Sequence, residues 1–263
     1  MAFSEASAYL GMMKLKTTLF LLAFSFVLLA LKSTSQDPKA IIQASENLFR
    51  GTKTFSEMEM QIVRKEWSKT ITMKSWTHGY ERTAMLVTGP AREKGTAFLR
   101  VDRSVWNWQP KIDRVIKMPP SMLSDGWMGS DFSNDDLVKE SSFVNDYTHI
   151  HLKDTTIENQ LCYQFELTPK EEAAVVWGKI QMNIAKKTKY QLLTKFYDED
   201  LELVNTLRFS EMKNLGGKVL PSKMTMTPAE NPSNKTIVRY ISLDFNPDIP
   251  ESFFTVQNLK RLR

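Results

Sequence analysis

The stretch FSEMEMQIVRKEWSKTITMK (residues 55–74) contains the pattern that decides the fold. In its first half Met58, Met60 and Ile62 alternate with polar residues, and a second alternation begins at Ile71. Successive side chains of a strand point to opposite faces of a sheet, so a period of two indicates one buried and one exposed face. The stretch therefore predicts two half-buried antiparallel strands.

The same alternation recurs along most of the chain and predicts roughly a dozen strands. The further runs lie at about 81–88, 96–102, 104–109, 114–118, 146–153, 161–168, 179–185, 190–197, 201–210, 219–227 and 236–245. So many strands with one apolar face each predict a large and strongly curved antiparallel sheet.

Helical signals are few. Residues 38–49 carry apolar side chains at helical spacing behind a first-turn proline, and Ser133 with Asp136 three residues later forms a capping pattern. Short helices are expected at 38–49, 120–125, 133–140 and 253–259. Because so few helices cannot cover a wide sheet tightly, we expect a mainly β protein. Its predicted architecture is an unclosed antiparallel β-barrel, or half-barrel, with a helical lid over an apolar cavity.

The N-terminal residues have the organisation of a secretory signal peptide. About 13 apolar residues (19–31) follow Lys14 and Lys16, and two small serines precede a cleavage point before Gln36. A membrane-spanning helix needs roughly 20 apolar residues, so an uncleaved N-terminal anchor is the less favoured alternative.

We expect residues 1–35 to be the signal peptide, with translation starting at Met1 or instead at Met12 or Met13. Residues 36–263 are then expected to form a single domain that is exported to the periplasm, because no repeat or low-complexity linker divides them.

Composition excludes several classes of protein. The 263 residues are 42% hydrophobic and 25% charged, which is typical of a globular protein. The formal net charge of +5 is too small to indicate a nucleic-acid partner. The single cysteine, Cys162, excludes an intramolecular disulfide and any multi-cysteine metal site.

No pattern of residues indicates catalysis or a metal. His149 and His151 lie two apart in a predicted strand, but no spacing marks the further ligands that a metal requires. The segment DFSNDD (131–136) lacks the glycine and glutamate of a calcium loop. Nucleophile elbows, phosphate-binding loops and zinc-protease helices are also missing from the sequence. We therefore expect no enzymatic activity, no metal and no cofactor.

Methionine and tryptophan are unusually frequent, with 14 and 6 residues against 10 glycines. Methionine is flexible and polarizable, which suits surfaces that repack around variable apolar ligands, although the same residues could fill a closed core. The candidate acyl-binding residues are Met58, Met60, Met85, Trp106, Trp108, Met118, Met122, Trp127, Met128 and Phe132.

Four segments resemble the LolA-like family of outer-membrane lipoprotein-sorting proteins. They are EKGTAFLRVDRSVWNWQPKIDRVIKMPPSM (93–122), WMGSDFSNDDLVKESS (127–142), AAVVWGKIQM (173–182) and YDEDLELVNTLRFSEMK (197–213). More narrowly, they are similar to a branch with a WMGSDFTNDDL-type motif. Ser133 stands where threonine is usual and keeps the hydroxyl group.

The resemblance implies a LolA-like half-barrel and a periplasmic carrier of the acyl chains of lipoproteins or lipids toward the outer membrane. Its implied partners are an inner-membrane ABC transporter and an outer-membrane acceptor lipoprotein. Exposing an acyl chain of ~15 methylenes to water costs about 12 kcal/mol, so an apolar cavity suffices without a reacting group. The alternative is a secreted structural or partner-binding module with a filled core, which a cavity above ~300 Å³ would disfavour.

Overall fold

The structure, a computed structural model, describes residues 37–136, 142–173 and 175–262. Fourteen strands lie in these residues and form one antiparallel sheet. They are β1 (Lys53–Val63), β2 (Ser68–His78), β3 (Arg82–Gly89), β4 (Ala97–Val101), β5 (Ser104–Gln109), β6 (Arg114–Lys117), β7 (Tyr147–His151), β8 (Thr155–Ile157), β9 (Gln160–Pro169), β10 (Lys179–Ala185), β11 (Gln191–Tyr197), β12 (Leu203–Leu215), β13 (Lys218–Pro228) and β14 (Lys235–Phe245).

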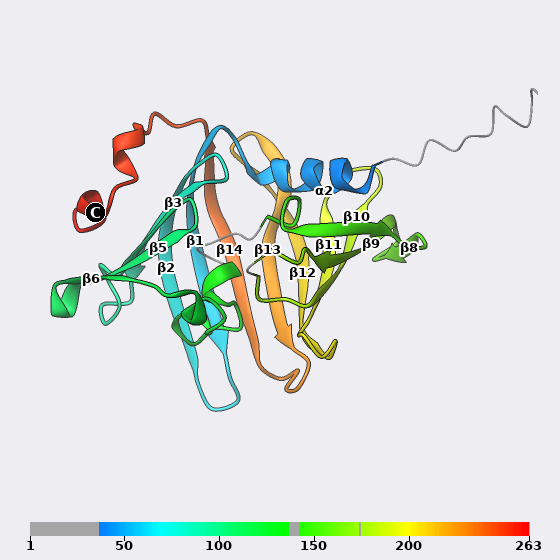
Figure 1. The fold of residues 1–263 in the computed structure, drawn as a ribbon, viewed down its shortest axis with the longest axis horizontal. Helices are drawn as coiled ribbons and strands as arrows, with labels where there is room; N and C mark the ends of the chain where they lie inside the picture. The colour runs from blue at the N-terminus through cyan, green and yellow to red at the C-terminus, as the bar shows by residue number, and fades with distance from the viewer. Residues whose placement is uncertain (1–36, 137–141, 174, 263) are drawn as a thin grey trace, which may run out of the picture. The chain divides into compact units, whose positions relative to one another are not determined.

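The sheet is open. Its strands follow the order β6-β5-β4-β3-β2-β1-β14-β13-β12-β11-β10-β9-β7, with β8 paired to β9. In the described residues the end strands β6 and β7 pair with different partners and not with each other, so the barrel is not closed (Figure 1). The predicted mainly β fold with an unclosed antiparallel sheet is confirmed.

The alternation in residues 55–74 has the predicted structural meaning. Met58 lies opposite Met73 and Met60 lies opposite Ile71 across the β1–β2 pair, so their side chains share one face. Met60 and Ile71 are fully buried. This face of β1 and β2 is the concave face that holds the main core.

In residues 37–136, 142–173 and 175–262 the helices are short and few. The α-helices named there are α2 (Pro38–Glu46) and α3 (Val256–Leu259), and the 3₁₀ turns are η1 (Asn47–Phe49), η2 (Pro110–Ile112), η3 (Pro120–Met122), η4 (Trp127–Gly129) and η6 (Glu251–Phe253). The helix expected at 38–49 is therefore α2 with η1, and the one expected at 120–125 shrinks to the single turn η3. None of the described helices has the length and apolar content needed to cross a bilayer.

Two hydrophobic clusters form on opposite faces of the sheet near β3. Met85 and Val87 point to the inner core, whereas Ala84 and Leu86 point to an outer cluster. The outer cluster consists of Ala84, Leu86, Ala97, Leu99, Trp108, Ile249, Phe254 and Leu259. The C-terminal segment with η6 and α3 thus covers the outer face of β3 to β5 (Figure 1).

Some predictions fall outside the described residues. These are the signal peptide at 1–35 and residues 137–140 of the helix expected at 133–140. By contacts, the chain divides into Met1–Asp37 and Pro38–Arg263, and the second unit contains every described strand.

Candidate functional site

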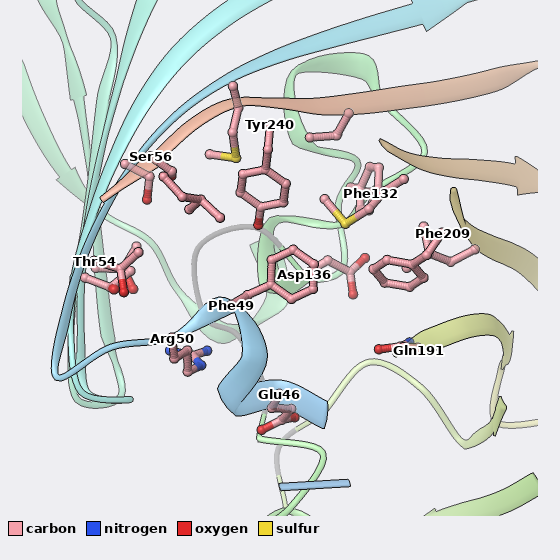
Figure 2. Close-up of a pocket in the computed structure, with 18 of the residues that line it drawn as sticks. Glu46, Phe49, Arg50, Thr54, Ser56, Phe132, Asp136, Gln191, Phe209 and Tyr240 are labelled. Carbon is pink, nitrogen blue, oxygen red and sulfur yellow. The ribbon is translucent and has the colours of Figure 1, made fainter. Parts of the chain in front are cut away.

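A pocket of about 240 Å³ lies on the concave face of the sheet, lined by strand residues, by α2 and η1, and by Phe132 (Figure 2). Its lining residues include Ser45, Glu46, Phe49, Arg50, Thr54, Ser56, Met58, Met60, Met73, Ser75, Thr77, Tyr80, Thr83, Met85, Phe132, Asp136, Gln191, Phe196, Leu207, Phe209, Met224, Met226, Val238, Tyr240 and Leu243. Apolar and polar side chains occupy different parts of this wall.

The apolar part is rich in methionine. Six methionines line the pocket, and they come from β3, β2, β1 and β13. In the sheet β14 lies between β1 and β13 and adds Val238 to the same wall. We call the six methionines the methionine floor: Met58, Met60, Met73, Met85, Met224 and Met226. Because thioether side chains rotate easily and are polarizable, this floor can adapt its shape to an apolar ligand.

The polar part next to the floor is a group of hydroxyl side chains. We call Thr54, Ser56, Ser75, Thr77 and Thr83 the hydroxyl belt, since all five line the pocket. Thr54 faces Thr77 and Ser56 faces Ser75 across β1 and β2, and Thr77 faces Thr83 across β2 and β3. The belt is therefore one continuous polar patch on three neighbouring strands.

Charged and phenolic groups complete the polar end. Arg50 follows η1, donates a hydrogen bond from Nη1 to the Gly79 carbonyl oxygen at 3.2 Å, and stacks over the Tyr80 ring at 4.3 Å. The Tyr80 hydroxyl donates to Asn47 Oδ1 at 2.5 Å, which ties η1 to the β2–β3 turn. Figure 2 shows the Tyr240 hydroxyl pointing into the pocket.

Burial changes the acidity of these groups. It raises the pKa of Glu46 to about 7, although the positive charge of Arg50 opposes the shift. Burial also lowers the pKa of Arg50 and raises the pKa of Tyr240. Among the described residues, Glu46 Oε2 is buried without a hydrogen-bond partner. Near neutral pH a large share of the Glu46 carboxyl groups therefore carries a proton.

The raised pKa of Glu46 predicts a pH-dependent stability. Since the folded state holds this proton more strongly than the unfolded state, stability falls as pH rises from 4.5 to about 7. Glu46→Gln should remove this loss and gain about 1 to 2 kcal/mol relative to wild type between pH 5 and pH 8. Thermal unfolding of both proteins at several pH values between 5 and 8 measures this difference in stability.

Glu66→Gln serves as the control for this experiment, because the Glu66 side chain is 80% exposed. Its unfolding curves should run parallel to those of the wild-type protein at every pH. Parallel curves for Glu46→Gln as well would contradict a raised pKa at Glu46.

The structure places four of the predicted acyl-binding residues at the pocket. Met58, Met60, Met85 and Phe132 all line it. Trp127 is fully buried in the inner core.

The other candidates lie elsewhere. Met118 and Met128 are partly buried against the inner core, and Met122 is 45% exposed. Trp106 and Trp108 pack in or against the outer cluster on the opposite face of the sheet. Met118 and Met128 thus pack against the same core as the four pocket residues but do not line the pocket, whereas Trp106 and Trp108 lie on the other side of the sheet.

Sequence reasoning missed much of the pocket wall. Thr54 and Ser56 continue the alternation of Met58 and Met60 toward the start of β1, so the period of two could have placed them on the concave face. Glu46, Arg50 and Tyr80 carry no such signal, since they reach the pocket from α2, from the residue after η1 and from a turn.

The motif segment around Asp131 is fastened to the sheet. Arg64 holds Asp131 with two hydrogen bonds of 3.0 and 3.1 Å, and the Thr236 hydroxyl donates to Asp131 Oδ2 at 2.6 Å. The Asn205 side-chain amide donates to the Asp131 carbonyl oxygen at 3.2 Å. Asp131 of the motif is therefore hydrogen-bonded to residues in β14 and β12 and to the residue that follows β1.

The predicted capping pair is confirmed. Ser133 Oγ accepts from the Asp136 amide at 3.0 Å, and Asp136 Oδ2 accepts from the Ser133 amide at 2.8 Å. The Trp177 indole also donates to Asp136 Oδ1 at 3.1 Å. Burial raises the pKa of Asp136, whereas these hydrogen bonds lower it. Asp131 and Asp136 of the motif thus both have structural partners.

The histidines have partners of their own. His149 Nε2 lies 2.5 Å from the Phe143 carbonyl oxygen, and His151 Nε2 lies 2.9 Å from Asp154 Oδ1. Within the described ranges, no group of three or more histidine, cysteine, aspartate or glutamate residues is arranged to hold a metal ion.

Known structures share this fold. A DUF1329 family protein from Desulfovibrio piger matches with a TM-score of 0.77 and 20% identity over 85% of this chain and 100% of its own. A domain from Vibrio parahaemolyticus, described as an outer membrane lipoprotein-sorting protein, matches with a TM-score of 0.74 and 25% identity over 85% of this chain and 98% of its own. A LolA superfamily protein from Nitrosomonas europaea matches with a TM-score of 0.73 and 20% identity over 84% of this chain and 98% of its own.

Sequence comparison gives a family but no curated relative. No curated protein matches the chain. A family described as "-like: Uncharacterized protein" matches residues 79–261. The predicted resemblance to LolA-like proteins is confirmed in the fold. The chain therefore belongs to the family that matches residues 79–261, and its fold is that of the LolA-like proteins.

Proposed function

We propose that this protein is a periplasmic carrier that holds acyl chains of lipoproteins or lipids in the pocket on the concave face and delivers them toward the outer membrane. The methionine floor is the observation that carries the proposal. It offers an apolar surface that can adapt to a flexible chain.

The size of the pocket bears on how it would work. At about 240 Å³ it is smaller than the ~300–1,000 Å³ of common ligand sites, so the floor has to move for a long acyl chain to enter. A pocket that closes when empty binds cargo more weakly than a preformed one, which favours release. The same small volume is the observation that favours the alternative, a structural module with a filled core.

The related structures support the carrier over the alternative. One structure with the same fold and 25% identity is described as an outer membrane lipoprotein-sorting protein. By analogy with the LolA system, loading would come from an inner-membrane transporter and unloading would go to an outer-membrane acceptor. The predicted signal peptide at 1–35 fits the same location. A helical lid over the pocket is part of this proposal.

Binding of a fluorescent fatty acid tests the proposal. We expect saturable binding of one probe per chain, with a rise in probe fluorescence because the chain leaves water, and displacement by dodecanoate. A filled core would show no saturable binding, and that result would contradict a carrier function.

A further inference from the structure

Polarity changes in one direction along the pocket wall. On β1, Thr54 and Ser56 precede Met58 and Met60, and all four line the pocket. On the antiparallel strand β2 the sequence runs the other way, so Met73 comes before Ser75. Met73 therefore lies beside Met58, and Ser75 lies beside Ser56. The hydroxyl belt and the methionine floor are therefore two adjacent zones of one pocket.

Four of the five belt residues are buried, and the hydroxyl groups of three of these four have unused hydrogen-bonding capacity. Ser56, Ser75 and Thr83 are each 6% exposed. In the described part of the chain their hydroxyl groups take part in no hydrogen bond. None of the three is among the buried side-chain atoms that lack a partner, so their hydroxyl groups open into the pocket. A patch of unpaired hydroxyl groups that opens into a pocket beside an apolar surface points to a polar ligand group at this place.

We propose that the pocket binds an acyl chain in one orientation, with its carbonyl-bearing head on the hydroxyl belt and its tail on the methionine floor. This inference rests on the proposed carrier function and adds the class of ligand and its direction. A carboxylate and an ester share the required chemistry, because both present carbonyl oxygens that accept hydrogen bonds from serine and threonine.

The charged groups at the polar end fit this orientation. Arg50 lies at the belt end of the pocket and brings a positive charge there (Figure 2). Glu46 lies one helical turn before Arg50, and burial raises its pKa to about 7. A protonated Glu46 donates a hydrogen bond to a carbonyl oxygen and does not repel an anionic head.

Three ligands with the same chain length test the orientation. Dodecanoate, methyl dodecanoate and dodecane are used to displace a fluorescent acyl probe from the full-length mature protein. The test variant Ser56→Ala/Ser75→Ala/Thr83→Val removes hydroxyl groups of the belt. The control variant Thr72→Val/Thr88→Val removes two hydroxyl groups from β2 and β3 that bond to each other outside the pocket.

We expect the test variant to bind its preferred carbonyl ligand at least 10-fold more weakly, while its affinity for dodecane changes less than 2-fold. The control variant should bind all three ligands like the wild type. If dodecanoate binds more tightly than its ester, the natural head is a carboxylate; if the ester binds more tightly, the natural ligand is an acyl ester.

Other results would overturn the inference. Unchanged binding of all three ligands by the test variant would refute the orientation but leave the carrier function standing, as would an equal loss for dodecane. A wild-type protein that binds none of the three would refute the carrier function as well.

Discussion

Replacing Asp131 with alanine is expected to lower the free energy of unfolding by about 2 to 4 kcal/mol. The Arg64 and Asp131 side chains are only 17% and 11% exposed. The substitution leaves a largely buried guanidinium group and the Thr236 hydroxyl without their carboxylate. Since a domain of this size loses about 2–4 °C per kcal/mol, Tm should fall by roughly 4 to 16 °C.

The ion pair between Lys65 and Glu66 provides the control. Its side chains are 85% and 80% exposed, so Glu66→Ala should change stability by less than about 0.5 kcal/mol. Thermal and urea unfolding of both variants measure the difference. If Asp131→Ala were as stable as Glu66→Ala, the hydrogen bonds of Asp131 would not be what holds the motif segment on the sheet.

Filling the pocket should have the largest effect on binding. Met58 lines the pocket on β1, and Met58→Trp places a bulkier ring in a space of about 240 Å³. We expect at least a 10-fold loss of affinity for a fluorescent fatty acid, because the ring takes the room of several methylene groups. Overpacking should cost about 1 to 3 kcal/mol of stability, so the variant should still fold.

Met212→Trp is the matched control, because Met212 is 50% exposed and does not line the pocket. Its affinity should equal that of the wild type. If Met58→Trp also keeps the wild-type affinity while unfolding cooperatively, acyl chains do not bind on the methionine floor.

The strands could be predicted because alternation needs only local sequence. The run expected at 104–109 is β5 with the same bounds, and the run at 236–245 differs from β14 by one residue. In contrast, β8 spans only Thr155–Ile157, which is too short for a period of two to be recognised.

It was harder to predict which face of each strand meets the pocket than to predict where the strands lie in the sequence. In β5, Val105 belongs to the inner core and Trp108 to the outer cluster, so both faces are covered. When both faces of a strand are covered, the alternation of its residues does not show which face meets the pocket. The large apolar side chains of Trp106 and Trp108 could pack on either face. The outer cover comes from Phe254 and Leu259, far away in the sequence.

The polar end of the pocket could not be found from sequence for a related reason. Glu46 and Arg50 reach it because η1 is tied to the β2–β3 turn through Tyr80 and Asn47. That contact joins residues 33 positions apart. Nothing in the local pattern of α2, or of the residues after η1, distinguishes these two side chains from ordinary surface residues.

Native mass spectrometry tests the acyl-carrier account most directly. The protein is purified without detergent from the periplasm of bacteria that export it, in parallel with Met58→Trp. We predict that wild-type protein carries a bound acyl-containing molecule, seen as an added mass that is released on activation, and that Met58→Trp carries much less. Wild-type protein that shows only its own mass, both as purified and after addition of dodecanoate, would contradict the account.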